Sequence, residues 1–575
     1  MSPRLNASIL TAALLATLAL PVAAAPVAPA KGRAVVPKPS PVPSMPAVPN
    51  VAPGYAAPAV APSAPELAGI TAQPFVGITL QDAIAMALLK NPDLAVSAAN
   101  ARIAGYQIAA AKGAYDVDFM LEPSVTHVSE APQNAFFAGP NFGAIVQNRQ
   151  QIQGGVSGIM PGGQQYSVSV SGGRVDDNTT INAFNPTFPT SLQLALSQPL
   201  LRGAGDNPVK HQIQLAIVGA DASQAQTLAA ASQTIAGVEN AYWDLVAAWR
   251  SVAIQEDALK EAIAQQGSTS RLAKAGQAAD IDAVESSGQV AMFEDNVYSA
   301  LQNVASLQNG LKGLIVDDPA DPIWRANLVP TSSVLSLPPA PSLDAVVASA
   351  LKQRPEIRQV ADLQKQADID AAFAKNQARP KLDVQAGYQS NGFAGNLIPA
   401  NVNPLGGPAP AVPPYLQGGL GQSTTNTLDG KFPTYNLGVV FSTPLGNHTA
   451  KAQLAIAAER QRIAALQTSG VYQRIQTESR NAVQLYGTAL ARLNAARVAR
   501  QTAEQVYASE NRKFHNGVST TYLVLQRQVE LQQARGRELQ AQTDLNKAVV
   551  ELNRVTGDIL TRNNVTIATI GGVAP

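Results

Sequence analysis

The chain has 575 residues, and its 41 basic and 40 acidic side chains leave a formal net charge of only +1. This balance argues against a nucleic-acid partner, because proteins that bind phosphate backbones usually carry a basic excess. The absence of cysteine excludes disulfides, thiolate metal sites, thiol nucleophiles and a lipid-modified N-terminal cysteine. Only 14% of the residues are charged, against roughly 25% in an ordinary soluble domain, whereas the hydrophobic fraction is 46%. The polar surface must therefore consist mainly of uncharged side chains.

The N-terminal segment has the features of an export signal. Arg4 precedes an apolar run from Ile9 to Ala25, which contains a proline and ends in small residues. A membrane-spanning helix needs about 20 apolar residues, so a signal peptide over residues 1–24 is the better prediction. Residues 25–77 are rich in Ala, Pro and Val, which predicts an extended linker without a packed core.

From about residue 78 onward the sequence is an internal duplication. The segment LQDAI at 80–84, followed by NPDL at 91–94, returns as LDAVV at 343–347, followed by RPEI at 354–357. Both halves have the order helix, strand, loop, strand, long helix, turn, helix. We therefore predict two repeats, 78–316 and 342–560, with a Pro-rich connector over 317–341 and a C-terminal tail over 561–575 that form a belt at mid-height.

Each repeat contains two alternating segments that predict strands. The expected strands lie at about 117–129 and 190–201 in the first repeat, and at about 381–389 and 435–445 in the second. In the second of these segments, one parity holds only leucines at 192, 194 and 196, whereas the other holds Gln, Ala and Ser. This alternation is typical both of a strand in a soluble sandwich and of a membrane-barrel strand with lipid on one side and water on the other.

The loops within the two strand pairs differ. The first loop, 130–189, contains its own hairpin signal, because residues 151–157 and 165–171 alternate around Pro-Gly-Gly at 161–163. This hairpin would either extend the strands above a membrane, which is the interpretation we favour, or add two strands per chain. The second loop, 390–434, is rich in Gly, Pro and Asn and is expected to be extracellular and mobile.

Long helices follow each strand pair. Apolar residues at 235, 238, 242 and 245 recur at steps of three and four, which predicts a coiled-coil-like seam. We predict helical hairpins over 206–316 and 450–557, with turns near 276 and 517. A helix over 206–266 would be about 90 Å long, whereas 281–316 and 343–375 would cover about 54 Å and about 50 Å. These two shorter helices could therefore stand end to end beside one long helix.

Taken together, these motifs resemble the TolC family of outer-membrane efflux proteins over residues 80–560. The features that carry the resemblance are the LQDAI and NPDL opening, the strand ending in QPL at 198–200, NAYWDL at 240–245, and the turns around 275–276 and 516–517. The resemblance implies a mixed α and β fold, with a duplicated helix–strand–strand–helix-hairpin unit. It further implies a homotrimer whose twelve-stranded outer-membrane β-barrel is continuous with a long periplasmic α-helical barrel. Four strands cannot close alone, and an open edge in lipid would leave backbone groups unpaired.

The resemblance also implies a function. The chain would be the passive exit duct of a tripartite efflux or type I secretion system in the outer membrane of a Gram-negative cell, with its barrel in contact with outer-membrane lipid. Small molecules or polypeptides would reach it from an inner-membrane transporter of the RND or ABC type through a periplasmic adaptor, a membrane fusion protein. The alternative is a periplasmic coiled-coil scaffold or adaptor without a pore of its own.

Nothing in the sequence indicates an enzyme. The four histidines lie in separate predicted elements, and neither a Gly-x-Ser-x-Gly motif nor a phosphate-loop pattern occurs. We therefore predict no catalytic residue, no cofactor and no metal site built within one chain.

The helical turns supply the candidate site residues. In the family, acidic residues just past the turn glycine can form a cation-binding ring at the pore constriction, and this chain has Asp280, Asp282 and Glu285 there. The alternative interpretation is that these acids complement the dipole at a helix N-terminus. The glycines are expected to adopt a positive φ at the helix ends. By resemblance, an adaptor would dock on the two tips, formed by Ala275, Gly276, Gln277, Asn516, Gly517 and Val518.

Overall fold

The computed structural model of the protein describes residues 75–132, 143–179, 181–332, 341–403 and 411–565, all of which belong to one compact unit. The predicted signal peptide, nearly all of the predicted linker, and most of the C-terminal tail lie outside the described residues.

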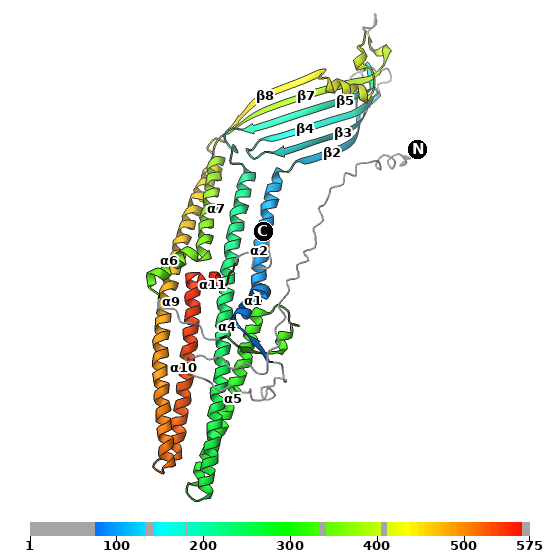
Figure 1. Ribbon diagram of the computed structural model, residues 1–575. Coiled ribbons are helices and arrows are strands. Elements are labelled where there is room, and N and C mark those ends of the chain that lie inside the picture. The colour runs from blue at the N-terminus through cyan, green and yellow to red at the C-terminus, as the bar shows by residue number, and fades with distance from the viewer. Residues whose placement is uncertain (1–74, 133–142, 180, 333–340, 404–410, 566–575) are drawn as a thin grey trace, which may run out of the picture. The chain divides into compact units, whose positions relative to one another are not determined.

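Helices and strands both contribute to this unit, so the predicted mixed α and β class is confirmed (Figure 1). The strands are β1 (Phe75–Ile78), β2 (Asp118–Glu130), β3 (Ile145–Ile159), β4 (Gln165–Asp177), β5 (Phe184–Pro199), β6 (Asn327–Pro330), β7 (Lys381–Leu397) and β8 (Phe432–Ser442). The α-helices are α1 (Leu80–Lys90), α2 (Pro92–Lys112), α4 (Pro208–Lys274), α5 (Asp280–Ile315), α6 (Leu343–Gln353), α7 (Pro355–Gln377), α8 (Leu420–Leu428), α9 (His448–His515), α10 (Thr521–Thr556) and α11 (Asp558–Arg562). Among the described residues, no helix is long and apolar enough to cross a membrane.

The main sheet has six strands in the order β2-β3-β4-β5-β7-β8, and every neighbouring pair is antiparallel. The expectation of four strands per chain is therefore wrong, because the hairpin in the first loop lies inside the sheet, between β2 and β5. The register aligns one apolar or aromatic residue from each strand in a single row, formed by Phe119, Val156, Val168, Leu194, Tyr388 and Tyr435.

The turn of the inserted hairpin lies at the end of the sheet where β5 leads into α4. The Asn207 side chain caps α4 and also donates a hydrogen bond from Nδ2 to the carbonyl of Pro161, at 2.9 Å. Gly163 has a φ of +93°, and a Cβ at this position would lie 2.6 Å from the carbonyl oxygen of Gly203. The hairpin thus extends down to the strand-to-helix corner, and it is not only an extension at the far end of the sheet.

The second loop is also more ordered than expected. Strand β7 continues through Leu397, well beyond the predicted end at 389, and α8 packs against the sheet. The predicted mobile loop over 390–434 is therefore partly wrong, because its described residues include half of β7, the helix α8 and the start of β8.

Both repeats open with a helix that a proline interrupts. Asn91 ends α1, and its side chain accepts a hydrogen bond from the backbone N–H of Leu94 at 3.0 Å, so that α2 begins at Pro92. In the second repeat Arg354 occupies the same place, before Pro355. A proline is tolerated at the first position of a helix because its missing N–H would have no partner there.

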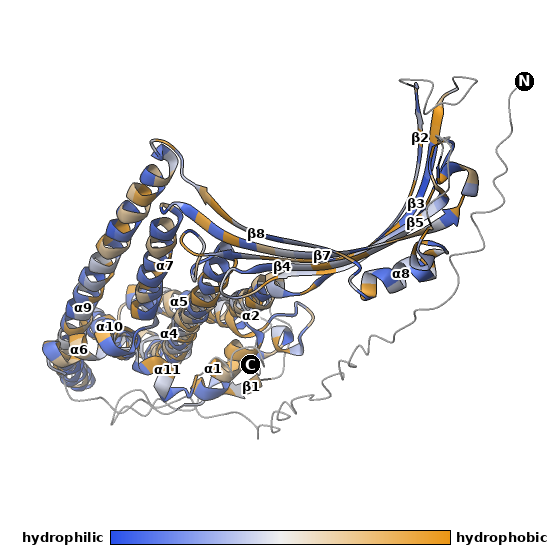
Figure 2. Ribbon diagram, turned by 90° about the horizontal axis from the view of Figure 1, so that it is seen from above, coloured by the Kyte–Doolittle hydropathy of each residue, from blue (hydrophilic) through white to orange (hydrophobic). Residues whose placement is uncertain are grey.

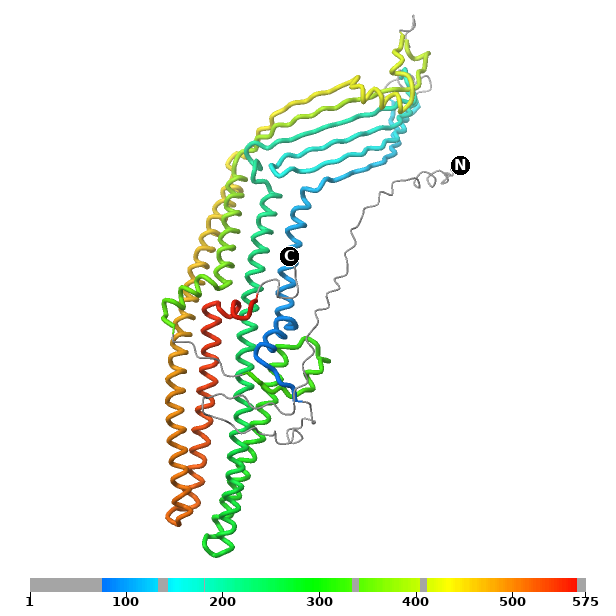
Figure 3. The backbone as a smooth tube through the Cα atoms, in the orientation of Figure 1, coloured from blue at the N-terminus to red at the C-terminus, as the bar shows by residue number. Residues whose placement is uncertain are grey.

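The helices nearest the sheet follow the order of the strands to which they connect. Helix α9 packs on α7, α7 on α4, and α4 on α2, and these four helices join β8, β7, β5 and β2 respectively. Farther from the sheet, α9 packs on α10, α10 on α4, and α4 on α5 (Figure 3). Helix α5 meets α1, whereas α10 meets α6. The segments 281–316 and 343–375 were expected to stand end to end, but they do not. Helix α5 is instead continued toward the sheet by α1 and α2, and α10 by α6 and α7.

A short belt, formed by β1 and β6, packs against the helices near the start of α1. Strand β1 pairs in parallel with β6, so the last residues of the predicted linker are in fact a strand. The Tyr242 hydroxyl donates to the carbonyl of Ile78 at 3.2 Å, and the Trp249 indole N–H donates to the carbonyl of Leu328 at 2.9 Å. These bonds fix the belt against α4, whose apolar seam forms the main hydrophobic core.

Candidate functional site

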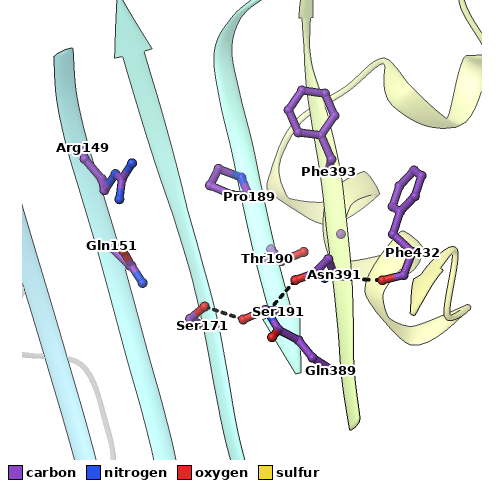
Figure 4. A pocket seen from close by; sticks show the side chains of 11 residues that line it. Arg149, Gln151, Ser171, Pro189, Thr190, Ser191, Gln389, Asn391, Phe393 and Phe432 are labelled. Carbon is purple, nitrogen blue, oxygen red and sulfur yellow. Dashed lines mark hydrogen bonds between the residues drawn. The ribbon is translucent and has the colours of Figure 1, made fainter. Parts of the chain in front are cut away.

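The six-stranded sheet is curved (Figure 2), and the strand register gives its two faces different chemistry. An open concavity of about 590 Å³ lies over β3, β4, β5 and β7 (Figure 4). Its polar lining residues are Arg149, Gln151, Ser171, Thr190, Ser191, Gln389 and Asn391, and Pro189, Phe393 and Phe432 line it as well. A second concavity, of about 620 Å³, lies closer to the helices and is lined by Asp116, Asp118, Ser157, Ser167, Gln193, Gln385 and Asn436, among others. One side of the sheet is thus mainly polar, with charged side chains such as Arg149 and Asp118 among the uncharged amides and hydroxyls.

Neighbouring side chains on this polar face form hydrogen bonds with one another. The hydroxyl oxygens of Ser171 and Ser191 lie 2.8 Å apart across β4 and β5. The Gln389 amide donates to Asn391 Oδ1 at 2.7 Å, and Asn391 Nδ2 donates to the carbonyl of Phe432 at 3.4 Å (Figure 4). A surface made mostly of amides and hydroxyls is wetted by water and has fewer of the charges that hold an ionic ligand tightly. It is chemically suited to let solutes pass.

The opposite face of the same strands is apolar over its central part. No charged residue occurs among its members, which are Phe119, Leu121, Ile152, Val156, Val168, Val170, Leu192, Leu194, Leu196, Val384, Tyr388, Tyr435, Leu437, Val439 and Phe441. Many of these side chains are exposed, and Leu437 reaches 81%. An apolar surface this large is too extensive for a soluble monomer and marks a contact with protein or lipid.

The two lateral edges are open as well. Within the described residues, β2 pairs only with β3, and β8 pairs only with β7. The helices below these edge strands, α2 and α9, each expose apolar residues at seven-residue steps. On α2 these are Val96 and Ile103, and on α9 they are Ile456 and Ile463. A strand edge with unpaired N–H and C=O groups is a template for pairing with another chain.

The two helical tips have the geometry that the sequence predicted. Gly276 has a φ of +69° and Gly517 a φ of +71°, so both glycines supply the left-handed conformation that ends a helix. The other predicted tip residues, Ala275, Gln277, Asn516 and Val518, are exposed beside them.

The three predicted acids all lie in the first turns of α5, just past this first tip. Asp282 Oδ2 accepts the backbone N–H of Ala279 at 3.3 Å and so caps the helix. Asp280 and Glu285 are exposed. No group of three or more possible metal ligands occurs in the part of the chain that the structure describes. Within one chain the acids therefore act as N-terminal helix charges, and a ring would require additional copies.

Sequence reasoning missed Glu239, a buried acid whose pKa is shifted. Glu239 is only 7% exposed, and burial raises its pKa to about 7, although a hydrogen bond with Asn563 and the charge of Arg562 both oppose this shift. The available signal was its spacing, because Glu239 lies four residues after Ile235 and three before Tyr242, on the apolar seam of α4.

Comparison with known proteins shows which family this chain resembles. Residues 346–558 match the family model for outer membrane efflux proteins. A comparison with curated protein sequences gave no significant match.

Solved structures of outer-membrane channels share the fold. The chain matches the outer-membrane channel OprN with 15% identity and a TM-score of 0.58, covering 83% of this chain and 89% of that chain. For the Campylobacter jejuni CmeC channel the identity is 14% and the TM-score 0.58, with 83% and 85% covered. For the open state of the Neisseria gonorrhoeae MtrE channel the identity is 17% and the TM-score 0.57, with 85% and 91% covered. The predicted resemblance is therefore confirmed: this chain is similar to the TolC-family outer-membrane efflux proteins, in sequence over 346–558 and in fold over most of its length.

Proposed function

We propose that this chain is an outer-membrane exit duct, in which the apolar face of the six-stranded sheet contacts lipid and the polar concave face lines a water-filled pore. The observation that carries the proposal is the separation of the two faces across all six strands, together with two unpaired edges. Membrane-barrel strands alternate in this way, apolar outward and polar inward.

Closure of the barrel requires more than one copy. Because every neighbouring pair is antiparallel, β2 and β8 run in opposite directions, and β8 of one copy can pair antiparallel with β2 of the next. The apolar stripes on α2 and α9 lie below the same two edges and would meet in the same contact. In the homotrimer that the family resemblance implies, the barrel would have eighteen strands instead of twelve. Barrels of 16–18 strands leave an aqueous channel.

The remaining assignments follow from this placement in the outer membrane of a Gram-negative cell. The helices extend into the periplasm, where the two tips would bind a membrane fusion protein, and an inner-membrane transporter of the RND or ABC type would supply the energy. The cargo would be small molecules or polypeptides of a tripartite efflux or type I secretion system. The duct would conduct passively, without catalysis.

The acids at the first tip would act only in the assembled duct. With three copies around one axis, Asp280, Asp282 and Glu285 would form a ring of carboxylates at the constriction. Carboxylate oxygens bind divalent cations, so such a ring would favour cations and would be blocked by them.

Reconstitution tests the duct directly. The full chain, extracted in detergent, should have the mass of three copies and should conduct ions when it is added to planar lipid bilayers. The alternative, a periplasmic scaffold without a pore, predicts a water-soluble protein that neither fractionates with outer membranes nor conducts, and that result would refute the duct.

A further inference from the structure

Helix α8 packs on the apolar face of the sheet and not on the polar one. Its partners Thr190 and Gly392 face each other in the register of β5 and β7, and Thr190 has the same parity as Leu192, Leu194 and Leu196. At the other end of the helix, a Cβ on Gly172 would lie 3.4 Å from Leu420 Cδ1. In Figure 2, α8 lies against the convex side of the sheet.

The side of α8 that faces the protein is polar. Ser423 and Asn426 are 0% and 1% exposed, and Thr427 is also buried. The Thr190 Oγ1 lies 2.8 Å from the Ser423 hydroxyl and 2.6 Å from the Thr427 hydroxyl. Asn426 Nδ2 donates to the carbonyls of Phe393 and Tyr415, at 2.8 and 2.7 Å. These hydrogen bonds satisfy the buried polar groups, as burial requires.

The exposed side of α8 has a leucine at each end, although Leu420 also reaches the sheet beside Gly172. Leu420 is 45% exposed and Leu428 is 76% exposed, with Thr424 between them at steps of four residues. The nine residues of α8 include no charged side chain. A helix on a water-facing surface normally has the reverse arrangement, with its apolar stripe toward the protein. The inverted arrangement is the one expected in apolar surroundings.

The contact between α8 and the sheet leaves no room for a looser arrangement. A Cβ on Gly392 would lie 2.1 Å from the carbonyl oxygen of Ser423 and 2.2 Å from the hydroxyl oxygens of Thr190 and Thr427. The backbone of β7 can approach the helix this closely only because residue 392 is a glycine.

The position of α8 along the sheet agrees with the edge of the apolar band. Leu382 begins the band at the helix end of β7, and Gly392 lies ten residues farther along the strand, about 33 Å at about 3.3 Å per residue. At a strand tilt of about 45° this corresponds to a height of about 23 Å, close to the band of about 25 Å that membrane barrels present. Helix α8 would therefore lie where the apolar band ends, at its far boundary.

We propose that α8 is a lipid-contacting helix, which places Leu420 and Leu428 against the acyl chains at the outer boundary of the membrane. The inference rests on the proposed position of the sheet in the outer membrane. The partner is lipid because the exposed side of α8 continues the apolar face of the sheet and carries no charge.

The natural absence of cysteine allows a site-specific test in the full-length protein. Leu428→Cys is labelled with a nitroxide in proteoliposomes, and its collision rates with oxygen, which concentrates in lipid, and with a water-soluble nickel chelate are measured. Val170→Cys, on the apolar face of β4, and Gln389→Cys, on the polar face of β7, are the matched controls. Leu420→Cys provides a second position on α8 should the first variant fail to assemble.

The three positions distinguish the possible failures. The inference expects the ratio of oxygen to nickel collisions at 428 to be several-fold higher than at 389, and lower than at 170, which lies deeper in the apolar band. A lipid-like ratio at 170 with a water-like ratio at 428 would overturn the role of α8 and leave the duct intact. Low collision rates at 428 with both oxygen and the nickel chelate would mean that protein covers α8, which also overturns the inference. A water-like ratio at 170 would refute the membrane position of the sheet itself.

Discussion

Adjacent residues of β4 provide a matched test of whether the inserted hairpin lies in the membrane. Val170 belongs to the apolar face and is exposed, whereas Ser169 belongs to the polar face and opposes Gln193 on the next strand. We compare Val170→Arg with Ser169→Arg, which add the same side chain one residue apart. Only the direction in which the new charge points differs between the two variants.

The expected size of the effect follows from the depth of Val170. It lies five residues beyond Gln165, where β4 begins, which is about 17 Å along the strand and about 12 Å in height at a tilt of about 45°. This is close to the middle of a band about 25 Å tall. An arginine that faces lipid near the midplane costs about 2–4 kcal/mol, so Val170→Arg should lose this amount of unfolding free energy per copy.

The assay is guanidinium unfolding of the protein in lipid vesicles, combined with single-channel recording. Val170→Ala measures the loss of the valine itself, and Leu194→Arg on β5 is a reference for a strand that was already expected from the sequence. Ser169→Arg should cost less than about 1 kcal/mol, because its charge remains in water. In the assembled duct it should also shift the ion selectivity toward anions.

Two results would refute this reasoning. Equal losses for Val170→Arg and Ser169→Arg would mean that the two faces of β4 do not differ in their surroundings. A large loss for Leu194→Arg with none for Val170→Arg would place β4 outside the bilayer and restore a barrel with four strands per chain.

Three further predictions concern the turn, the buried acid and the tip. Gly163→Ala should lower the thermal midpoint by the equivalent of about 2 kcal/mol, because φ is +93° at this residue and the new Cβ would meet a carbonyl oxygen. The control Gly237→Ala, at an open helical site, should not lower it. Equal midpoints for the two variants would contradict the packing of the turn. Because Glu239 has a pKa of about 7 in the fold, the free energy of unfolding should fall as the pH rises from about 4.5 to about 7. Glu239→Gln should therefore raise the free energy of unfolding by up to about 3 kcal/mol above pH 7 and leave it unchanged near pH 4. A gain that does not depend on pH would exclude the carboxyl as the cause. Asp282→Asn combined with Glu285→Gln should weaken the block of conductance by divalent cations, and an unchanged block would rule out the carboxylate ring.

Local patterns explain why so much of the fold was predictable. Pro92 and Pro355 each stand at the first position of a helix, α2 and α7, where a proline is tolerated. The positive φ of Gly276 and Gly517 follows from the residue type, since only glycine adopts it without strain. The alternation of Leu192, Leu194 and Leu196 correctly indicated one apolar face, because side chains on a strand point to opposite sides in turn.

Errors arose where the outcome depends on contacts between residues far apart in the sequence. The hairpin signal in the first loop was correct, but a sequence does not state which strand lies beside which. Its place in the sheet depends on pairs such as Phe119 with Val156 and Val168 with Leu194, and on the contact of its turn with Asn207. The buried carboxyl of Glu239 was missed for a related reason, because its neighbours Arg562 and Asn563 come from the other end of the chain.

The sequence by itself determined the duplicated motifs, the long helices, the strands that flank them, the helical turns and the excess of uncharged polar residues, because each of these depends on composition or on short-range periodicity. Only the tertiary structure decided that the sheet has six strands, which helices stack end to end, and that α8 buries its polar side against the sheet and leaves Leu428 exposed. The side chains that hold α8, Thr190 and Ser423, are separated by 233 residues. No periodicity within either segment reveals such a pairing, because it exists only once the strands have aligned and brought the two hydroxyls within hydrogen-bonding distance.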